Sequence, residues 1–235
     1  MKNLITIGLP SKGRLKDKSV AFFDDRGLKV LQNKKERNYF ATIENKPNIK
    51  IIYLHAKEII QRLGDGTLDI GISGLDLLNE SENNLQDKIN IKKKLNFGEA
   101  NLVVAVPDDW IDVQTVADLE EVAFDIRLKR NARLRVATKY PNLTNNFLIS
   151  KGVTQYKLIS SLGATETYPF IGSSEIITDI TSTGKTLEDN NLRVLKDGDI
   201  LKSSACMLVS KKSLVDKNKK KIIFNLLKKL NLKAI

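Results

Sequence analysis

Short apolar runs alternate with segments of helical periodicity along this chain, and no other feature limits its fold as much. Strand-like runs occupy residues 4–9, 49–54 and 68–73, and helical segments at 15–26 and 56–63 lie between them. Strands separated by crossover helices pair in parallel, because each helix returns the chain to the same edge of the sheet. The sequence therefore predicts an α/β fold with mostly parallel sheets.

The same alternation continues through the second half of the chain. Further strands are predicted at 102–106, 134–138, 156–162, 176–180 and 205–210, with helices at 116–122, 142–151 and 217–230. A chain of 235 residues is long enough for two small lobes. We expect one lobe made of residues 1–99 and 192–235, and a second lobe, 100–191, inserted into it.

The formal net charge of +11 suits polyanionic partners such as nucleic acid, acidic lipid or phosphorylated small molecules. Basic residues concentrate in the stretches 127–135 and 211–233. In the second stretch an apolar stripe at helical spacing predicts a helix that packs on the sheet with its lysines outward; its residues are Ile222, Ile223, Leu226, Leu227 and Leu230. We expect neither a membrane-surface helix nor nucleic-acid binding, since these stretches are poor in aromatic residues.

Several classes of protein are disfavoured by what the sequence lacks. No apolar run is long enough to span a bilayer, and the N-terminus does not resemble a signal peptide. The single cysteine, Cys206, excludes an internal disulfide. No cluster of histidine, cysteine and acidic residues indicates a transition-metal site. We therefore expect a cytoplasmic protein with a free, buried thiol.

The segment 176–188 carries the most chemical information. An apolar strand ends at Asp179; the hydroxyl-rich residues Thr181, Ser182, Thr183, Gly184, Lys185 and Thr186 follow, and then a helix is predicted. Small residues let the backbone approach a phosphate, and the helix N-terminus adds positive potential. A nucleotide P-loop would need glycine at position 179, where a carboxylate would repel phosphate. A ribose 5-phosphate fits better, because Asp179 can accept hydrogen bonds from sugar hydroxyls. An ordinary hydroxyl-rich helix cap is the alternative.

Other polar residues follow predicted strands at the carboxyl edge of the sheet, where ligands of open α/β folds bind. Lys12, Gly13 and Arg14 suit a polyphosphate, or are solvated residues of a turn. Gly74 and Asp76 follow another strand, and Asp76 contacts a ligand or caps a helix. His55, the single histidine, is more simply structural than catalytic.

Taken in order, these motifs resemble the short form of the ATP phosphoribosyltransferase family along nearly the whole chain. The blocks that carry the resemblance are Pro10-Ser11-Lys12-Gly13-Arg14-Leu15, Leu68-Asp69-Ile70-Gly71-Ile72-Ser73-Gly74, Leu95-Asn96-Phe97-Gly98, Arg135-Val136-Ala137-Thr138-Lys139-Tyr140-Pro141, Gly163-Ala164-Thr165-Glu166 and Asp179-Ile180-Thr181-Ser182-Thr183-Gly184-Lys185-Thr186-Leu187. The last block resembles the family signature. The resemblance implies two lobes like those of a type II periplasmic binding protein, with the active site in the cleft between them.

The resemblance also implies an activity and a set of site residues. The expected reaction transfers phosphoribosyl from phosphoribosyl pyrophosphate to N1 of ATP with Mg²⁺, releases pyrophosphate and opens histidine biosynthesis. Asp179, 181–186 and Glu166 would hold phosphoribosyl pyrophosphate. The catalytic cations would be Lys12, Arg14 and Arg37, and the ATP site would comprise Lys12, Gly13, Arg14, His55, Gly74 and Asp76. The metal ligands are left open.

Two departures from the family pattern stand out. Many members carry arginine where His55 stands, and the basic stretch before Arg135 is longer than in the commonest form. We expect no C-terminal regulatory domain like that of the long form. The resemblance therefore implies a homo-oligomer, expected to be a dimer, that works with a regulatory subunit resembling histidyl-tRNA synthetase.

Three other functions are kept as alternatives. A phosphoribosyltransferase with a different acceptor base would use the same loop 179–186. A non-catalytic solute-binding protein would share the two-lobed architecture, although such proteins normally carry a signal peptide. A basic nucleic-acid-binding protein would show a steep dependence of binding on salt.

Overall fold

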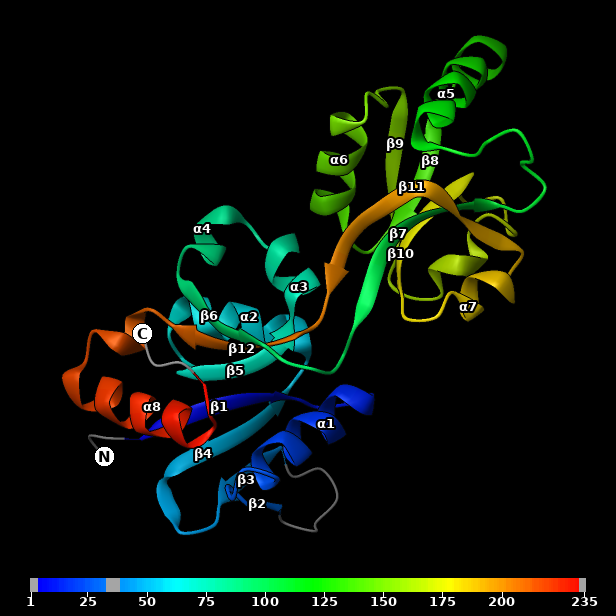
Figure 1. The fold of residues 1–235 in the computed structure, drawn as a ribbon. Helices are drawn as coiled ribbons and strands as arrows, with labels where there is room; N and C mark the ends of the chain where they lie inside the picture. The colour runs from blue at the N-terminus through cyan, green and yellow to red at the C-terminus, as the bar shows by residue number, and fades with distance from the viewer. Residues whose placement is uncertain (1–3, 33–38, 233–235) are drawn as a thin grey trace. The chain divides into compact units, whose positions relative to one another are not determined.

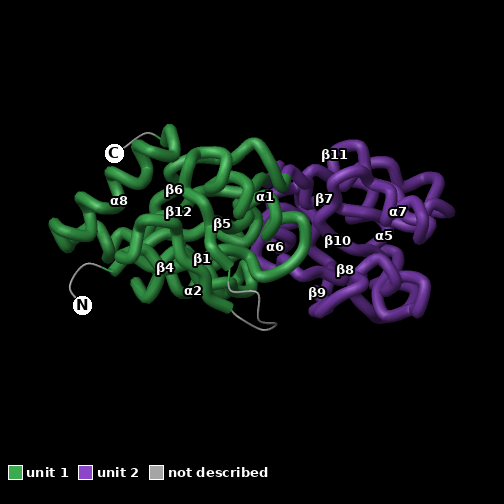
Figure 2. The backbone as a smooth tube through the Cα atoms, turned by 90° about the horizontal axis from the view of Figure 1, so that it is seen from below, with its two compact units in different colours: residues 1–98, 204–235 green, residues 99–203 purple. Residues whose placement is uncertain are grey.

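The computed structural model describes residues 4–32 and 39–232, and they form two compact units. Unit 1 comprises 1–98 and 204–235, and unit 2 comprises 99–203, which Figure 2 shows in different colours. Each unit is built on its own sheet, with seven strands in unit 1 and five in unit 2. The prediction of an α/β chain with two lobes is confirmed.

Unit 1 has a parallel centre and antiparallel flanks. Its strands lie in the order β2 (Val30–Gln32), β3 (Phe40–Ile43), β4 (Lys46–Leu54), β1 (Ile5–Pro10), β5 (Ile70–Gly74), β12 (Ala205–Ser210) and β6 (Ile89–Lys94). Strand β1 pairs in parallel with β4 and β5, and every other pairing described in this sheet is antiparallel. The polar residues that follow β1, β4 and β5 therefore share one edge.

Helices cover both faces of this sheet (Figure 1). They are α1 (Gly13–Asp24), α2 (Ala56–Asp65), α3 (Leu75–Glu80), α4 (Asn83–Gln86) and α8 (Lys217–Lys229), with a short 3-10 helix η2 (Lys212–Leu214) before α8. One apolar cluster joins α1 and α8 to the sheet, and another joins α2 to the opposite face. The close approach of α2 needs glycine in the sheet: a Cβ on Gly71 would lie 2.5 Å from Cγ2 of Ile59.

Helix α8 packs as its apolar stripe predicted. Ile223, Leu226 and Leu227 are buried in the first cluster of unit 1. A buried carboxylate ties the start of α8 to the sheet: Asp69 Oδ1 accepts hydrogen bonds from Nζ of Lys219 and Oγ of Ser213, both at 2.7 Å. The C-terminal lysines are thus part of a packed helix. Within the described residues, no helix is long and apolar enough to cross a membrane.

Unit 2 combines a parallel half with an antiparallel half. Its strands lie in the order β11 (Leu192–Ser203), β7 (Ala100–Pro107), β10 (Ile176–Thr181), β8 (Leu134–Thr138) and β9 (Tyr156–Ser160). Pairing is parallel between β10 and β8 and between β8 and β9, and antiparallel from β10 through β7 to β11. Helices α5 (Val116–Arg130), α6 (Pro141–Ser150) and α7 (Lys185–Glu188), with η1 (Thr165–Thr167), complete the unit.

The structure corrects the sequence-based description in two places. The sheets are mixed rather than mostly parallel, because hairpin-like neighbours such as β2 and β3 add antiparallel edges. The chain also returns to unit 1 after Ser203 rather than at residue 192. Residues 192–203 form β11, which pairs with β7 of unit 2 from Leu192 to Ser203.

Candidate active site

In unit 2 the parallel strands bring three predicted segments to one edge. Thr138, at the end of β8, lies beside Ser160 of β9 and Thr178 of β10. Lys139 and Ser161 follow β8 and β9, and the loop 179–186 begins within the last residues of β10 and continues beyond it. The carboxyl edge of a parallel sheet is the usual position of a ligand site. The predicted phosphate loop therefore lies in a suitable place within its own unit.

Asp179 is held in a defined orientation at this edge. Asp179 is only 9 % exposed. Its own strand supplies one hydrogen bond, from the N–H of Ile180 to Oδ1 at 2.8 Å. Across the sheet, Nζ of Lys139 lies 3.6 Å from Oδ2. The carboxylate keeps acceptor capacity on both oxygens, as recognition of sugar hydroxyls requires.

The loop after Asp179 is a tight turn that closes on itself. The N–H of Gly184 donates to Oγ1 of Thr181 at 2.9 Å, and Gly184 has a φ of +80° that favours glycine. Oγ of Ser182 donates to the carbonyl of Glu99 at 3.2 Å. The exposed side chains of the loop are Ser182, Thr183, Lys185 and Thr186. The turn thus presents hydroxyl groups and an ammonium group to solvent.

The structure also limits the predicted contribution of the helix. The helix predicted after the loop, α7, is one turn of four residues, so its positive end is weaker than that of a longer helix. Thr183 Oγ1 accepts a hydrogen bond from the N–H of Lys185 at 3.4 Å, but the N-cap of α7 is Gly184 and no side chain of a described residue caps the helix. The hydroxyl-rich helix cap that was the alternative interpretation of this segment is therefore not formed.

The predicted Glu166 lies on a second turn of this edge. Its 3-10 helix η1 packs against β10. Oγ1 of the buried Thr165 lies 2.9 Å from Oγ of Ser161, which fixes the turn to the end of β9. Ala164 has a φ of +45°, an uncommon conformation for alanine. This anchoring leaves the side chain of Glu166 half-buried beside the strand that carries Asp179.

In unit 1 the basic loop lies at the carboxyl edge of the parallel strands. The N–H of Ser11 donates to the carbonyl of Leu54 at 2.8 Å, so the ends of β1 and β4 are joined. Lys12, Gly13 and Arg14 follow and are exposed. Within the described residues, the side chains of Lys12 and Arg14 form no hydrogen bond or ion pair, and no atom lies within 4 Å of a Cβ built on Gly13. This loop offers positive charge to solvent.

The other predicted residues of unit 1 have clear local roles. His55 is the N-cap of α2, and its Nδ1 accepts a hydrogen bond from the N–H of Lys57 at 3.3 Å, as the structural alternative predicted. Gly74 is the N-cap of α3, and a Cβ there would collide with Oδ1 of the buried Asp76. Arg37 lies outside the described residues. His55, Gly74 and Asp76 remain predictions for ATP binding.

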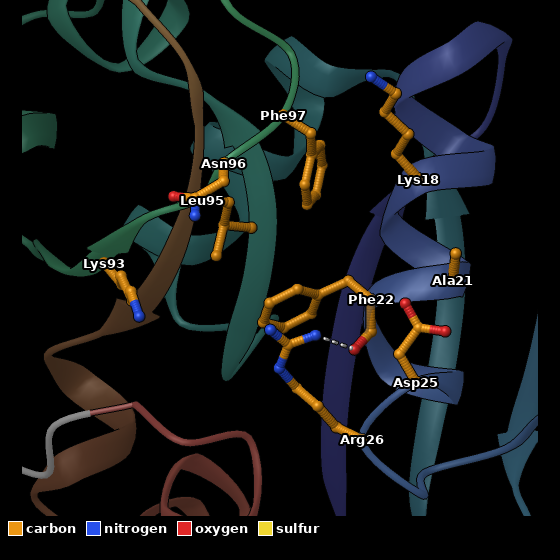
Figure 3. Close-up of a pocket in the computed structure, with 9 residues that line it drawn as sticks. All are labelled: Lys18, Ala21, Phe22, Asp25, Arg26, Lys93, Leu95, Asn96 and Phe97. Atoms are coloured by element: carbon orange, nitrogen blue, oxygen red, sulfur yellow. Dashed lines mark hydrogen bonds between the residues drawn. The ribbon is translucent and has the colours of Figure 1, made fainter.

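A hollow of about 270 Å³ lies elsewhere in unit 1, between α1 and the segment 93–97 (Figure 3). The ring of Phe22 lies 6.2 Å from that of Phe97, and the guanidinium of Arg26 lies 3.9 Å from the Phe22 ring centroid. Arg26 also donates to the carbonyls of Phe22 and Leu230, at 3.1 and 3.2 Å. These contacts join α1 to the end of α8 and give the motif residue Phe97 a packing role.

Sequence reasoning did not single out Lys139 as a site residue. It precedes α6 and is forty positions from Asp179, so only the parallel pairing of β8 with β10 brings the two together. Beneath them, three buried threonine hydroxyls bond to one another: Thr178 to Thr138 and to Thr144, both at 2.6 Å, and Thr138 to Thr144 at 3.1 Å. The position of Lys139 at a strand end was the available signal.

Comparisons with known proteins agree with this arrangement. A family model described as ATP phosphoribosyltransferase matches residues 55–232. The ATP phosphoribosyltransferases of Brucella melitensis biotype 2 and Brucella suis are each 46 % identical over 210 residues, covering 89 % of this chain and 91 % of theirs.

Solved structures show the same fold. A chain of the ATP phosphoribosyl transferase (HisG:HisZ) complex from Thermotoga maritima superposes with a TM-score of 0.72 at 25 % identity, covering 97 % of this chain and 96 % of that one. A substrate-binding protein of an amino acid ABC transporter gives a TM-score of 0.54 at 14 % identity over 97 % and 93 % of the two chains, which is a likeness of fold alone. The predicted architecture of a type II periplasmic binding protein is confirmed, and the chain belongs to the ATP phosphoribosyltransferase family.

Proposed function

We propose that this chain is the catalytic subunit of an ATP phosphoribosyltransferase, which joins the phosphoribosyl group of phosphoribosyl pyrophosphate to N1 of ATP in the first step of histidine biosynthesis. The observation that carries the proposal is the loop 179–186. A buried, oriented carboxylate is followed by a tight hydroxyl-rich turn, at the carboxyl edge of parallel strands. Membership of the family supports the same activity.

In this proposal unit 2 holds the sugar. Asp179 accepts hydrogen bonds from the ribose hydroxyls, and Ser182, Thr183, Lys185 and Thr186 bind the 5-phosphate, with Thr181 and Gly184 shaping the turn. Nζ of Lys139, 3.6 Å from Oδ2 of Asp179, helps to orient the carboxylate. Glu166 borders the same site from the η1 turn. Fixing the sugar in this way reduces the translational and rotational entropy that is lost on reaching the transition state.

Unit 1 supplies positive charge for the departing group. The exposed Lys12 and Arg14 have no anionic partner in the part of the chain that the structure describes, so they are available to a polyphosphate. We extend the same role to Arg37. Charge-assisted hydrogen bonds from such groups stabilise an anion that develops in the transition state. Gly13, His55, Gly74 and Asp76 complete the proposed ATP side.

The chemistry needs little proton transfer. The lone pair of adenine N1 attacks C1′ of the ribose as the bond from C1′ to the pyrophosphate oxygen breaks, and pyrophosphate leaves with that electron pair. The sugar is oxocarbenium-like at this point, so electrostatic stabilisation is the main requirement. Since N1 carries a free lone pair, attack requires no general base, which agrees with a site of cations, hydroxyls and one oriented carboxylate.

Magnesium is proposed to enter with the substrate. Among residues 4–32 and 39–232 no group of three histidine, cysteine or acidic side chains is placed to hold a metal ion. Mg²⁺ is commonly bound through substrate phosphates and only one or two carboxylates, so binding with the substrate needs no such group. Bound there, it would neutralise charge on the pyrophosphate.

The relative from Thermotoga maritima was solved as a HisG:HisZ complex, and this supports a second subunit for the present chain. We propose a cytoplasmic hetero-oligomer in which a dimer of this chain works with a regulatory subunit resembling histidyl-tRNA synthetase. The basic stretches are not proposed to bind nucleic acid or membrane.

An assay with ATP and phosphoribosyl pyrophosphate tests the proposal. The chain is incubated with both substrates and Mg²⁺, with and without the purified regulatory subunit, and N1-(5-phosphoribosyl)-ATP is separated by chromatography. Guanine, adenine and orotate replace ATP in parallel reactions and would reveal a different acceptor. Absence of product from ATP under both conditions would overturn the proposal, and binding of ribose 5-phosphate without any turnover would favour a solute-binding protein.

A further inference from the structure

The second half of α5 carries apolar and basic side chains that no role described above uses. Phe124 and Leu128 lie one turn apart and are 56 % and 67 % exposed. Arg127 and Arg130 lie on the same half of the helix, Arg133 follows its end, and all three are exposed. We call these five residues the α5 patch. In Figure 1, α5 extends beyond the strands of its sheet.

The exposure of Phe124 and Leu128 follows from the packing of the helix. The buried stripe of α5 consists of Val116, Leu119 and Ala123, and these residues form the apolar core with β8 and its neighbours. Phe124 and Leu128 do not belong to this stripe and are exposed, although a monomeric helix normally carries polar residues at its exposed positions. Apolar side chains at such positions are expected when a second surface covers them.

The charges of the α5 patch are not neutralised within unit 2. Asp125 pairs with Lys129, and Arg135 pairs with Glu175 at 2.7 Å. Arg127, Arg130 and Arg133 form no ion pair or hydrogen bond with any described residue. Cations in the last turn also suit the negative end of the helix dipole, but that effect accounts for neither the aromatic nor the leucine side chain.

The position of the α5 patch separates it from the substrate loop. Arg133 immediately precedes the first residue of β8, whereas Lys139 and Asp179 lie at the carboxyl ends of β8 and β10. Five residues of strand place these two edges about 15 Å apart. A macromolecule bound to the α5 patch would therefore leave the loop 179–186 open to its ligand.

We propose that the α5 patch docks the regulatory subunit, through an acidic surface of that subunit that contains an apolar recess for Phe124 and Leu128. Arginine and aromatic residues dominate the energetics of protein interfaces, and unpaired arginines select an acidic partner. A nucleic acid fits less well, because a short helix end offers no continuous basic track. The inference rests on the proposed function, since it names the surface through which that enzyme meets its second subunit.

The test uses the full chain and the purified histidyl-tRNA-synthetase-like subunit. The variant Arg127→Glu/Leu128→Asp changes the α5 patch, and a second variant, Phe124→Ser, removes only apolar area. The matched control, Lys221→Glu/Val215→Asp, makes the same kinds of change at exposed positions of unit 1. Isothermal titration calorimetry measures the Kd for the subunit, and circular dichroism confirms folding. Affinity for ribose 5-phosphate is measured for each variant.

We expect the Kd to rise about 30-fold or more in the double variant and about 10-fold in Phe124→Ser, and to stay within about twofold in the control. Binding of ribose 5-phosphate should be unchanged in all three variants. Equal affinity of the wild type and the double variant for the subunit would overturn the docking proposal, and so would an absence of binding by the wild type.

Two further measurements distinguish this proposal from the proposed function and from binding of RNA or membranes. If ATP and phosphoribosyl pyrophosphate give no product while assembly still depends on the α5 patch, the proposed function fails and the docking surface stands. The same variants are titrated with a single-stranded RNA and with anionic vesicles. Loss of RNA or vesicle binding in the double variant, with assembly unaffected, would assign the α5 patch to that ligand and overturn docking.

Discussion

Two loops of this molecule lie at the ends of parallel strands, yet they differ in how many of their polar groups are held by hydrogen bonds. Loop 179–186 of unit 2 is internally bonded: Asp179 is oriented by Ile180 and Lys139, and Thr181 closes the turn onto Gly184. Loop 10–14 of unit 1 is joined to its neighbour by one backbone bond from Ser11, and its cations are exposed. Polar groups of the first loop are held by hydrogen bonds, whereas the side chains of Lys12 and Arg14 in the second form no such contact with the described residues.

This difference matches the two demands of phosphoribosyl transfer. A sugar phosphate is recognised by position, and preformed hydrogen-bonding groups bind it without losing further entropy. A departing pyrophosphate moves as it leaves, and the exposed side chains of Lys12 and Arg14 are long enough to follow it. We therefore expect the hydrogen-bonded groups of unit 2 to control substrate affinity and the cations of unit 1 to control turnover.

The largest expected effect comes from Asp179→Asn, which tests loop 179–186. The amide keeps the shape but loses the charge and part of the acceptor capacity that ribose hydroxyls need. We expect kcat/KM for phosphoribosyl pyrophosphate to fall about 100-fold or more, most of it as a rise in KM. Steady-state kinetics measure this, with Asp189→Asn, an exposed acid just after α7, as the control. A loss confined to kcat would contradict the assignment of Asp179 to binding.

The next effect comes from Arg14→Ala, which tests the cationic loop. Removing a group that stabilises the departing anion should lower kcat about 10- to 100-fold and change KM for phosphoribosyl pyrophosphate little. The free energy of unfolding should change by less than about 0.5 kcal/mol, because Arg14 is exposed and unpaired among the described residues. The control is Lys18→Ala, one turn further along α1. An unchanged rate in Arg14→Ala would remove this residue from the mechanism.

The contrast between the loops also explains what the sequence could predict. Local patterns sufficed for the strand-to-loop arrangement at Asp179 and for the exposed cations after β1, because both depend on neighbouring residues. The partner of Asp179 was not predictable, because Lys139 meets it only through strand pairing across the sheet. The capping role of His55 follows from its position just before α2, where a side chain can accept a hydrogen bond from the first turn of the helix.

Edge strands and the unit boundary were the other failures. Strand β6 was not predicted, because Lys92, Lys93 and Lys94 leave it without apolar alternation. It nevertheless pairs with β12, where Ile89 lies opposite Ser210. Strand β11 includes Lys196-Asp197-Gly198-Asp199, which has the composition of a turn, and β11 has register shifts there. The predicted boundary at residue 192 lies ahead of the end of unit 2 at Ser203, because β11 belongs to the sheet of unit 2 despite its turn-like residues.

A smaller effect, Gly184→Ala, separates strain from ligand contact. Gly184 has a φ of +80°, and Gly13 in the other loop has a φ of +67°. Alanine in this conformation should cost about 1 kcal/mol of unfolding free energy at either position. Only Gly184→Ala should also weaken binding of ribose 5-phosphate, by about fivefold, since its loop is the internally bonded one. Thermal unfolding and calorimetry measure the two effects, and Gly163→Ala, without a positive φ, controls for stability. Equal loss of ribose 5-phosphate affinity in Gly13→Ala would contradict the comparison.

The smallest expected effect is a pH dependence that belongs to unit 2. Three carboxyl groups of this unit have lowered pKa values. Burial raises the pKa of Glu175, but hydrogen bonds and charge from Arg135 outweigh it, so that the pKa lies below its usual range. Burial also raises the pKa of Asp197, but the hydrogen bond from the N–H of Val116 and the charge of Lys151 outweigh it, so that this pKa is lowered too. The backbone N–H groups of Thr115 and Gln114 lower the pKa of Asp118.

The sign of this effect follows from the lowered pKa values. Each group favours folding when it is ionised, so its contribution is complete above the unfolded-state pKa, about 4, and is lost as the pH falls through the lower folded-state value. The single tryptophan, Trp110, lies in unit 2, and its fluorescence therefore reports on this unit. We expect urea unfolding monitored by Trp110 to show decreasing stability from pH 5 to about pH 3. Glu175→Gln should be less stable at pH 6 and lose less on acidification, because Arg135 no longer faces a group that titrates. A pH profile of Glu175→Gln parallel to that of the wild type would show that the pair at the start of β10 does not anchor the strand that carries Asp179.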